Sequence, residues 1–304
     1  MKRAAIAIGS NSTRLLCADV RDGMLTNCLR GREETRLFLG LDEEGNIRPE
    51  RLEATAQAVS RLAFIARNAG AEQVDLLATS ATRDAKNGFA LGERIFALCG
   101  LRLRVISGEE EAALAFRAVS QGQRRMVMDI GGGSTEWTLG QENQVEWSVS
   151  MQLGASRLLK MQPIDSPEDA LRALAIARST MAPYAEALKK LPPAPALIGL
   201  GGSCTTSAAM VMGREAHGEQ VEGKQVTLSQ AREQLERLSR MTLEERMHVP
   251  GLPPARAVHM PHGLCILIAA LDALGFDRLT VSGKTNLDGY LSSMAEREAA
   301  GPFL

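Results

Sequence analysis

The chain alternates short apolar runs with longer amphipathic stretches. In the first half, β-prone runs predict strands at 4–8, 14–20, 24–38, 73–78 and 102–106. Apolar residues at helical spacing, among them Leu52, Val59 and Leu62, predict a helix over 50–69. Further helices are expected at 88–98 and 109–119. The sequence Arg21-Asp22-Gly23 predicts a hairpin turn between the second and third strands.

The second half continues the alternation. Strands are expected at 124–130, 196–200 and 278–282, and a hairpin is expected over 135–153. Helices are expected at 167–190, 203–212, 228–240, 255–274 and 286–298. Strands that alternate with helices in this way are typical of an α/β fold.

One segment of the first half is echoed in the second half, about one domain length further along the chain. Residues 7–16 read AIGSNSTRLL, and residues 129–138 read DIGGGSTEWT. The echo predicts two halves of related topology, because each copy follows a strand candidate and precedes a second β-prone run. A short break near Gln121-Gly122-Gln123 predicts domains at 1–120 and 121–304 that share a cleft. The last helix is able to pack back on the first domain.

Composition narrows the classes of function. The chain has 304 residues, of which 45% are hydrophobic and 23% charged, so it is not a disordered chain. A net charge of -1 and only 4% aromatic residues argue against DNA or membrane binding through a broad basic surface. Any anion site must therefore be local. Five scattered cysteines argue against a disulfide framework or zinc site and favour the cytoplasm.

Glycine-rich turns are the main candidates for such a local site. Backbone N–H groups in a glycine turn can approach an oxyanion closely, and serine and asparagine add polar donors. The candidate phosphate-binding residues are Gly9, Ser10, Asn11, Ser12, Thr13, Gly131, Gly132, Gly133, Ser134, Gly201, Gly202 and Ser203. A plain hairpin turn is the alternative for the first two groups, and a simple N-cap is the alternative for Ser203. Asp129 and Glu136 flank the second turn and are candidate Mg²⁺ ligands.

An acidic stretch, Ser107-Gly108-Glu109-Glu110-Glu111-Ala112, precedes an apolar helix. Acidic residues at a helix start also complement the helix dipole, which is the structural alternative. Three acids are more than such a cap requires. Hydrolysis of a phosphoanhydride needs a carboxylate that orients or deprotonates water.

Five segments taken together resemble the exopolyphosphatase / guanosine pentaphosphate phosphohydrolase family, in its short two-domain form. They match in order and spacing over nearly the whole chain: 7–16, ATSATRDAKN at 78–87, VISGEEEAALAF at 105–116, MDIGGGSTEW at 128–137 and GLGGSCTTSAA at 199–209. The resemblance implies an α/β fold with two actin-like (ribonuclease H-like) domains flanking a cleft. It also implies that Glu111 is the catalytic base and that Arg83 lies in the phosphate-binding region. Arg36 is a weaker candidate for the same role.

Two positions depart from the family pattern. Aligning the internal echo puts Ala7 opposite Asp129, whereas the family usually has aspartate at the first position as well. Leu287-Asp288-Gly289 stands where the family typically has Arg-Glu-Gly. These departures favour a weak or altered enzyme as an alternative. The internal alignment also predicts that Ala7→Asp would strengthen Mg²⁺-dependent hydrolysis.

The resemblance implies a hydrolase that releases the terminal phosphate of inorganic polyphosphate, the 5′-phosphate of guanosine pentaphosphate, or both, with Mg²⁺ as cofactor. A catalytically silent sensor of polyphosphate or guanosine tetraphosphate is the first alternative. An ATP-dependent small-molecule kinase of the same superfamily is the second. A homodimer is compatible with the sequence, which does not rank the two substrates.

Overall fold

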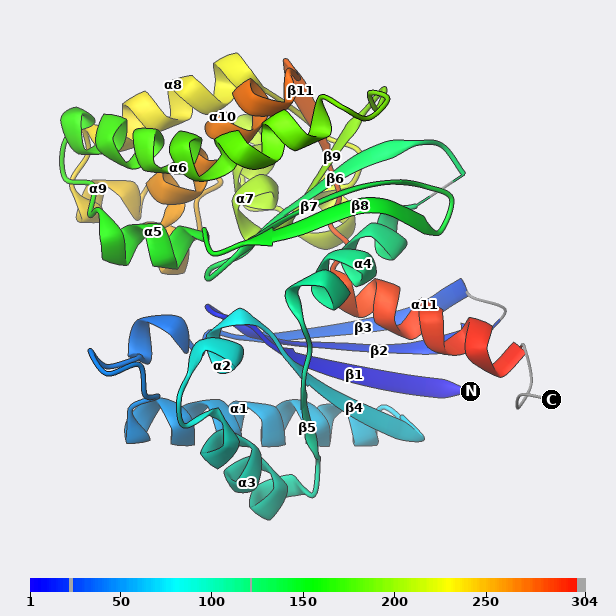
Figure 1. Ribbon diagram of the computed structural model, residues 1–304. Helices are drawn as coiled ribbons and strands as arrows, with labels where there is room; N and C mark the ends of the chain where they lie inside the picture. Colours follow the sequence, from blue (N-terminus) through cyan, green and yellow to red (C-terminus); the bar gives the residue numbers. More distant parts are fainter. Residues whose placement is uncertain (22–23, 121, 300–304) are drawn as a thin grey trace. The chain divides into compact units, whose positions relative to one another are not determined.

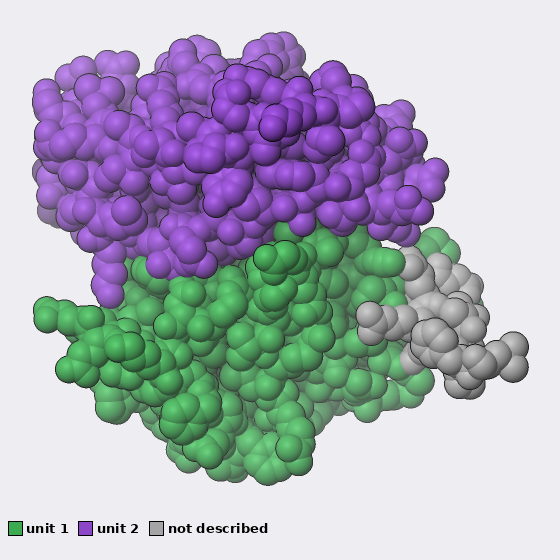
Figure 2. Space-filling view, in the orientation of Figure 1, with its two compact units in different colours: residues 1–118, 285–304 green, residues 119–284 purple. Residues whose placement is uncertain are grey.

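The computed structural model describes residues 1–21, 24–120 and 122–299. The chain divides into two compact units, and Figure 2 colours them separately. Unit 1 comprises residues 1–118 together with the C-terminal segment from 285, and unit 2 comprises residues 119–284. Asp22, Gly23 and Gln121, which the sequence placed in a turn and at the domain break, lie outside the described residues.

Among the described residues of unit 1, five strands form one sheet in the order β3-β2-β1-β4-β5. Neighbouring strands in β3-β2-β1 are antiparallel, whereas β1-β4 and β4-β5 are parallel. The strands are β1 Lys2–Ile8, β2 Thr13–Arg21, β3 Met24–Glu33, β4 Gln73–Ala78 and β5 Leu103–Val105. The strand predicted over 24–38 ends at Glu33, because Arg36 adopts a left-handed backbone with φ of 48° and the 3₁₀ helix η1 follows at Phe38–Gly40.

Strand β1 is buried on both faces. Ile6 and Ile8 point into a core beneath the first long helix, which contributes Leu62. Ala5 and Ala7 point to the opposite face, where they pack with residues of the helices that begin at Gly108 and Asn286. Figure 1 shows helices on both faces of this sheet. The helices of unit 1 are α1 Pro49–Asn68, α2 Ser80–Asp84, α3 Gly88–Cys99, α4 Gly108–Val119 and α11 Asn286–Ala299.

Helix α11 belongs to unit 1, although it lies at the far end of the chain. The guanidinium of Arg30 on β3 donates two hydrogen bonds of 3.1 and 2.6 Å to the carboxylate of Asp288. A Cβ on Gly289 would lie 1.9 Å from the Leu114 carbonyl oxygen, so only glycine allows α11 to cross α4 this closely. The C-terminal helix therefore packs on the first sheet, the arrangement that the sequence analysis allowed for the last helix.

Unit 2 contains a sheet of the same plan. Among its described residues the strand order is β10-β11-β9-β6-β7-β8. Strands β6, β7 and β8 form antiparallel pairs, and β9 pairs parallel with both β6 and β11. The strands are β6 Arg125–Ile130, β7 Thr135–Gln141, β8 Gln144–Met151, β9 Leu197–Leu200, β10 Gln225–Thr227 and β11 Arg278–Val281. An antiparallel three-stranded start followed by a parallel strand is thus common to both units, as the internal echo predicted.

The core of unit 2 surrounds α10, which is buried from Met260 to Leu271. The helix predicted over 255–274 is divided into a short 3₁₀ helix and α10, which starts at Met260. Pro261 fits this first turn because the missing N–H is not needed there. The helical segments of unit 2 are α5 Ala155–Met161, α6 Pro167–Leu188, α7 Gly201–Met212, η2 Gly218–Val221, α8 Leu228–Ser239, α9 Leu243–Arg246, η3 Pro254–Arg256 and α10 Met260–Leu274. Among the described residues, none of the helices combines the length and apolar character that crossing a membrane requires.

Candidate functional site

The first glycine turn joins β1 to β2. The Gly9 N–H donates to the Ser12 carbonyl oxygen at 3.1 Å and closes the turn. The carbonyls of Ser10 and Asn11 accept hydrogen bonds of 2.9 and 2.8 Å from the N–H groups of Phe38 and Arg36. The turn is therefore held by the segment that follows the β2-β3 hairpin.

The second glycine turn joins β6 to β7 and is closed by the same kind of hydrogen bond. The Gly131 N–H donates to the Ser134 carbonyl oxygen at 3.0 Å. The carbonyls of Gly131 and Gly132 accept from the N–H groups of Ala155 and Ser156 at 3.0 and 2.8 Å. Helix α5, which supplies these donors, follows the β7-β8 hairpin, just as the 36–38 segment follows the β2-β3 hairpin. The start of the helix lies so close that a Cβ on Gly154 would be 2.4 Å from the Gly132 carbonyl oxygen.

These contacts determine where the N–H groups of each turn point. In a trans peptide the C=O and the following N–H point in opposite directions. Because the carbonyls of 131 and 132 face α5, the N–H groups of Gly132 and Gly133 point away from it. The N–H groups of Asn11 and Ser12 point away from the 36–38 segment for the same reason. Successive N–H groups that point to one side are able to bind an anion in a nest.

The threonine that follows each turn has a different environment from the turn itself. The hydroxyl of Thr13 lies 3.2 Å from that of Thr35, and Thr13 is completely buried. The hydroxyl of Thr135 donates to the Leu153 carbonyl oxygen at 2.5 Å. Each hydroxyl therefore makes a hydrogen bond to a residue of its own unit. Thr13, which the sequence grouped with the phosphate-binding residues, thus uses its side chain in packing.

Two carboxylates flank the second turn. Asp129 and Glu136 are direct partners in the β6-β7 register, so their side chains emerge on the same face of the sheet. Glu136 is buried and accepts a hydrogen bond of 2.7 Å from the Ser150 hydroxyl. Like charges directly opposite one another are unfavourable unless a cation or another partner offsets them. In the first turn the equivalent partners are Ala7 and Arg14.

This carboxylate pair fits a magnesium ion. Mg²⁺ is usually held by one or two protein carboxylates, with water and phosphate oxygens completing the shell. In the part of the chain that the structure describes, no group of three or more His, Cys, Asp or Glu residues is arranged to hold a metal. Beside the second turn, the residues of this chemistry are Asp129 and Glu136, which are only two, so water and phosphate oxygens would have to complete the shell.

The third turn lies at the start of α7 and adjoins Asp129. Gly201 has φ of 83°, and a Cβ there would lie 2.5 Å from the Asp129 carboxylate oxygen Oδ1. The helix begins at Gly201 with Leu200 as its N-cap, so Ser203 does not cap it. The hydroxyl of Ser203 instead faces α10, where a Cβ on Gly263 would approach it to 2.3 Å. Asp129 and residues 201–203 thus come together within unit 2.

An arginine that the sequence analysis missed lies on the third turn. A Cβ on Gly202 would be 1.9 Å from an Nη nitrogen of Arg256, so the guanidinium of Arg256 lies directly against the glycine. Arg256 is only 8% exposed. The sequence pattern placed Arg256 in the apolar helix predicted over 255–274. Nothing in its neighbouring residues indicates a contact with Gly202. A guanidinium beside a helix start suits phosphate oxygens.

The acidic stretch of unit 1 separates into three different environments. Glu110 forms an ion pair with Arg104 at the surface. The Glu109 N–H and the Ser107 hydroxyl hydrogen-bond the Glu109 carboxylate and lower its pKa. Glu111 is 8% exposed, and its N–H donates to the Ser107 carbonyl oxygen at 3.0 Å. Glu111 is thus the buried member of the three, whereas Glu110 has a structural partner.

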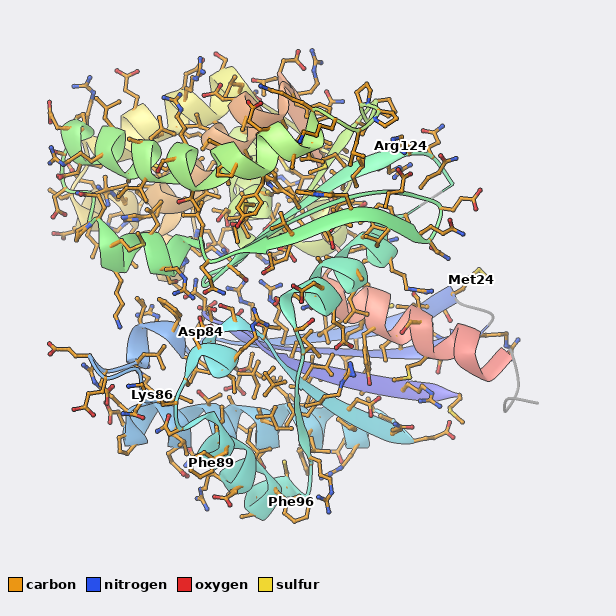
Figure 3. The ribbon with its side chains drawn as sticks, in the orientation of Figure 1. Met24, Asp84, Lys86, Phe89, Phe96 and Arg124 are labelled. Carbon is orange, nitrogen blue, oxygen red and sulfur yellow. The ribbon has the colours of Figure 1, made fainter. Side chains whose placement is uncertain are left out.

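Arg83 is brought next to Glu111. It lies on the short helix α2, one residue before Asp84, which Figure 3 labels. Its Nη1 donates to the Ile106 carbonyl oxygen at 2.7 Å and lies 3.7 Å from Oε2 of Glu111. Arg36 is exposed on the segment that binds the first turn, and its N–H donates to the Asn11 carbonyl oxygen of that turn.

The two departures from the family pattern lie in one place. Ala7 and Leu287 belong to the same buried apolar cluster, together with Leu77, Ile106, Leu114, Tyr290 and Leu291. Asp288 caps the start of α11 through the Thr285 N–H at 2.8 Å and pairs with Arg30. The apolar residues at 7 and 287 are therefore packed against a common set of neighbours.

Comparison with known proteins extends the resemblance over both units. A profile of the Ppx/GppA phosphatase family matches residues 16–298. Exopolyphosphatase 2 of Mycobacterium tuberculosis is 34% identical over 96% of this chain and 98% of that protein. The guanosine-5′-triphosphate,3′-diphosphate pyrophosphatase of Vibrio atlanticus is 28% identical over 96% of this chain, a match that covers 59% of that protein. A crystal structure of the Aquifex aeolicus Ppx/GppA family member is 29% identical, with a TM-score of 0.81 and 98% of both chains covered.

Proposed function

Because the chain belongs to the Ppx/GppA phosphatase family, we propose that it hydrolyses phosphoanhydride bonds. The substrates would be the terminal phosphate of inorganic polyphosphate, the 5′-phosphate of guanosine pentaphosphate, or both. The observation that carries the proposal is the second glycine turn, whose carbonyls are bound to α5 and whose N–H groups point away from it. That arrangement suits a phosphate group.

Phosphate binding would rest on main-chain donors and one cation. In unit 2 the N–H groups of Gly132 and Gly133 would supply directed donors, and Arg256 would supply a guanidinium beside the start of α7. In unit 1 the N–H groups of Asn11 and Ser12 would supply the corresponding donors. Such pre-oriented groups stabilise charge that develops on phosphate oxygens without reorganising during the reaction.

Glu111 is the proposed general base. Its carboxylate is largely withdrawn from solvent at the start of α4, and Arg83 lies 3.7 Å away. The carboxylate would accept a proton from the attacking water as the bond to the terminal phosphorus forms and the anhydride oxygen leaves.

Mg²⁺ is the proposed cofactor. Asp129 and Glu136 would hold it, because they lie opposite each other on one face of the β6-β7 hairpin. When bound, the ion would offset negative charge on the phosphate oxygens.

We further propose a cytoplasmic location. Cys204 and Cys265 are completely buried, and burial raises the pKa of Cys204 strongly and that of Cys265 to about 12. Free thiols that form no disulfide are typical of proteins in a reducing compartment.

The test is phosphate release by the purified chain from inorganic tripolyphosphate and from guanosine pentaphosphate, with and without Mg²⁺. Glu111→Gln is nearly isosteric and removes the proton acceptor, so we expect turnover to fall about 10²–10⁴-fold with binding retained. Binding without release by the wild type would support the silent sensor instead. A Glu111→Gln variant with wild-type turnover would remove Glu111 as the base.

A further inference from the structure

Helix α5 contributes one side-chain donor to the second glycine turn, in addition to its main-chain donors. The Nε of Arg157 donates to the Gly133 carbonyl oxygen at 2.7 Å. Arg157 also donates its main-chain N–H to the Gly132 carbonyl oxygen at 3.0 Å. Side chain and main chain of one residue therefore bind two consecutive carbonyls of the turn.

The Gly133 carbonyl needs this side chain. Among the described residues, the main chain supplies donors to the carbonyls of Gly131 and Gly132 but none to that of Gly133. The peptide that joins Gly133 to Ser134 is the last of the turn, and its N–H belongs to Ser134. Its orientation is therefore set by the Arg157 contact, since C=O and N–H of one peptide point in opposite directions.

Without a contact of this kind, the 133–134 peptide would have more conformational freedom than in a turn without glycines. Three consecutive glycines precede Ser134, and glycine has access to backbone conformations that other residues avoid. The first turn has Ser10 and Asn11 at the equivalent positions, and two main-chain N–H groups hold their carbonyls. In the second turn, by contrast, the carbonyl at the third of these positions accepts from a side chain, the Nε of Arg157.

We propose that Arg157 is a positioning residue, which holds the 133–134 peptide so that the Ser134 N–H points toward bound phosphate. This inference rests on the proposed function, because it assigns a role within the same phosphate site. Arg157 acts through the main chain of the turn and needs no contact of its own with the substrate.

The experiment compares Arg157→Lys and Arg157→Met with wild type. Lysine keeps the positive charge but has a methylene where Nε donates, so it separates the hydrogen bond from the charge. The matched control is Lys160→Met, which removes one charge from an exposed position on the same helix. The probe is inorganic tripolyphosphate, with affinity measured by calorimetry and the Ser134 amide followed by ¹⁵N relaxation without ligand.

Both Arg157 variants should bind tripolyphosphate about tenfold more weakly, and the control should change by less than about twofold. The Ser134 amide order parameter should fall from about 0.85 toward about 0.6 in both variants, with unchanged thermal unfolding. An Arg157→Lys variant that binds as wild type would overturn the inference, because charge alone would then suffice. Unchanged Ser134 dynamics in both variants would overturn it as well.

Different results would overturn the positioning role of Arg157 and the proposed function. If wild type binds tripolyphosphate and both Arg157 variants bind it equally well, the positioning role falls and the proposed function stands. If wild type neither binds nor hydrolyses tripolyphosphate or guanosine pentaphosphate, the proposed function fails and takes the inference with it.

Discussion

The substitution Ala7→Asp tests how the first turn differs from the second. Ala7 is 6% exposed and packs with Leu114 and Leu287 on the α4 and α11 face of β1. An aspartate there would place a carboxylate among apolar side chains. From the sequence alone, the same change was expected to complete a magnesium site, because Ala7 aligns with Asp129.

The packing predicts a large loss of stability. Burying an ionised or poorly paired carboxylate costs several kcal/mol, and added volume in a filled cluster costs more. Arg14 is the cross-strand partner of residue 7 and would offset part of that cost. We expect Ala7→Asp to lower the free energy of unfolding by roughly 3 kcal/mol and the isosteric, neutral Ala7→Asn by roughly 1–2 kcal/mol.

The assay is denaturant unfolding of both variants, each also combined with Leu287→Arg. A guanidinium at 287 would enter the same cluster, so it should restore stability in the aspartate background and not in the asparagine background. Mg²⁺-dependent phosphate release is measured in parallel. If Ala7→Asp is as stable as wild type and its hydrolysis gains Mg²⁺ dependence, the apolar-cluster argument is refuted and the expectation from the internal alignment holds.

Further predictions concern unit 2. Glu136→Gln relieves the like-charge pair with Asp129, so tripolyphosphate should bind more tightly than to wild type in EDTA and more weakly in Mg²⁺, as calorimetry would reveal. Gly154→Ala places a Cβ 2.4 Å from the Gly132 carbonyl oxygen and should cost about 1–3 kcal/mol of unfolding free energy. Burial lowers the pKa of His262 from 6.5 to about 4, so the unfolded chain binds more protons between these values. Stability should be full above pH 6.5 and fall by about 3 kcal/mol toward pH 4, a slope that His262→Gln removes in denaturant titrations at each pH.

Much of the fold and the family were accessible from the sequence because the signals are local. The two hairpins are encoded by apolar runs around glycine turns, and the structure and comparisons confirm the α/β class and the family. The roles assigned to Glu111, Asp129 and Glu136 stay predictions, although the structure brings the last two into register.

What the sequence did not reveal depends on distant partners. Arg30 and Asp288, which form the ion pair between β3 and α11, are 258 positions apart. Arg256 touches Gly202, and Arg157 binds Gly133 across two intervening strands. Neither Arg157 nor Arg256 lies in a local motif, because each contact is decided by how a helical segment packs against a turn rather than by spacing along the chain.

The two turns share their main-chain construction but differ in charge. Each is closed by a glycine N–H to a serine carbonyl, at 3.1 Å in unit 1 and 3.0 Å in unit 2. The cross-strand pair beside it is Ala7 and Arg14 in the first case and Asp129 and Glu136 in the second. The first pair therefore contains one basic residue and no acid, whereas the second contains two acids, which are the kind of residue that holds a divalent ion. Any divalent-ion requirement should therefore reside in unit 2 alone, and the absence of an acid at position 7 does not by itself predict an inactive protein.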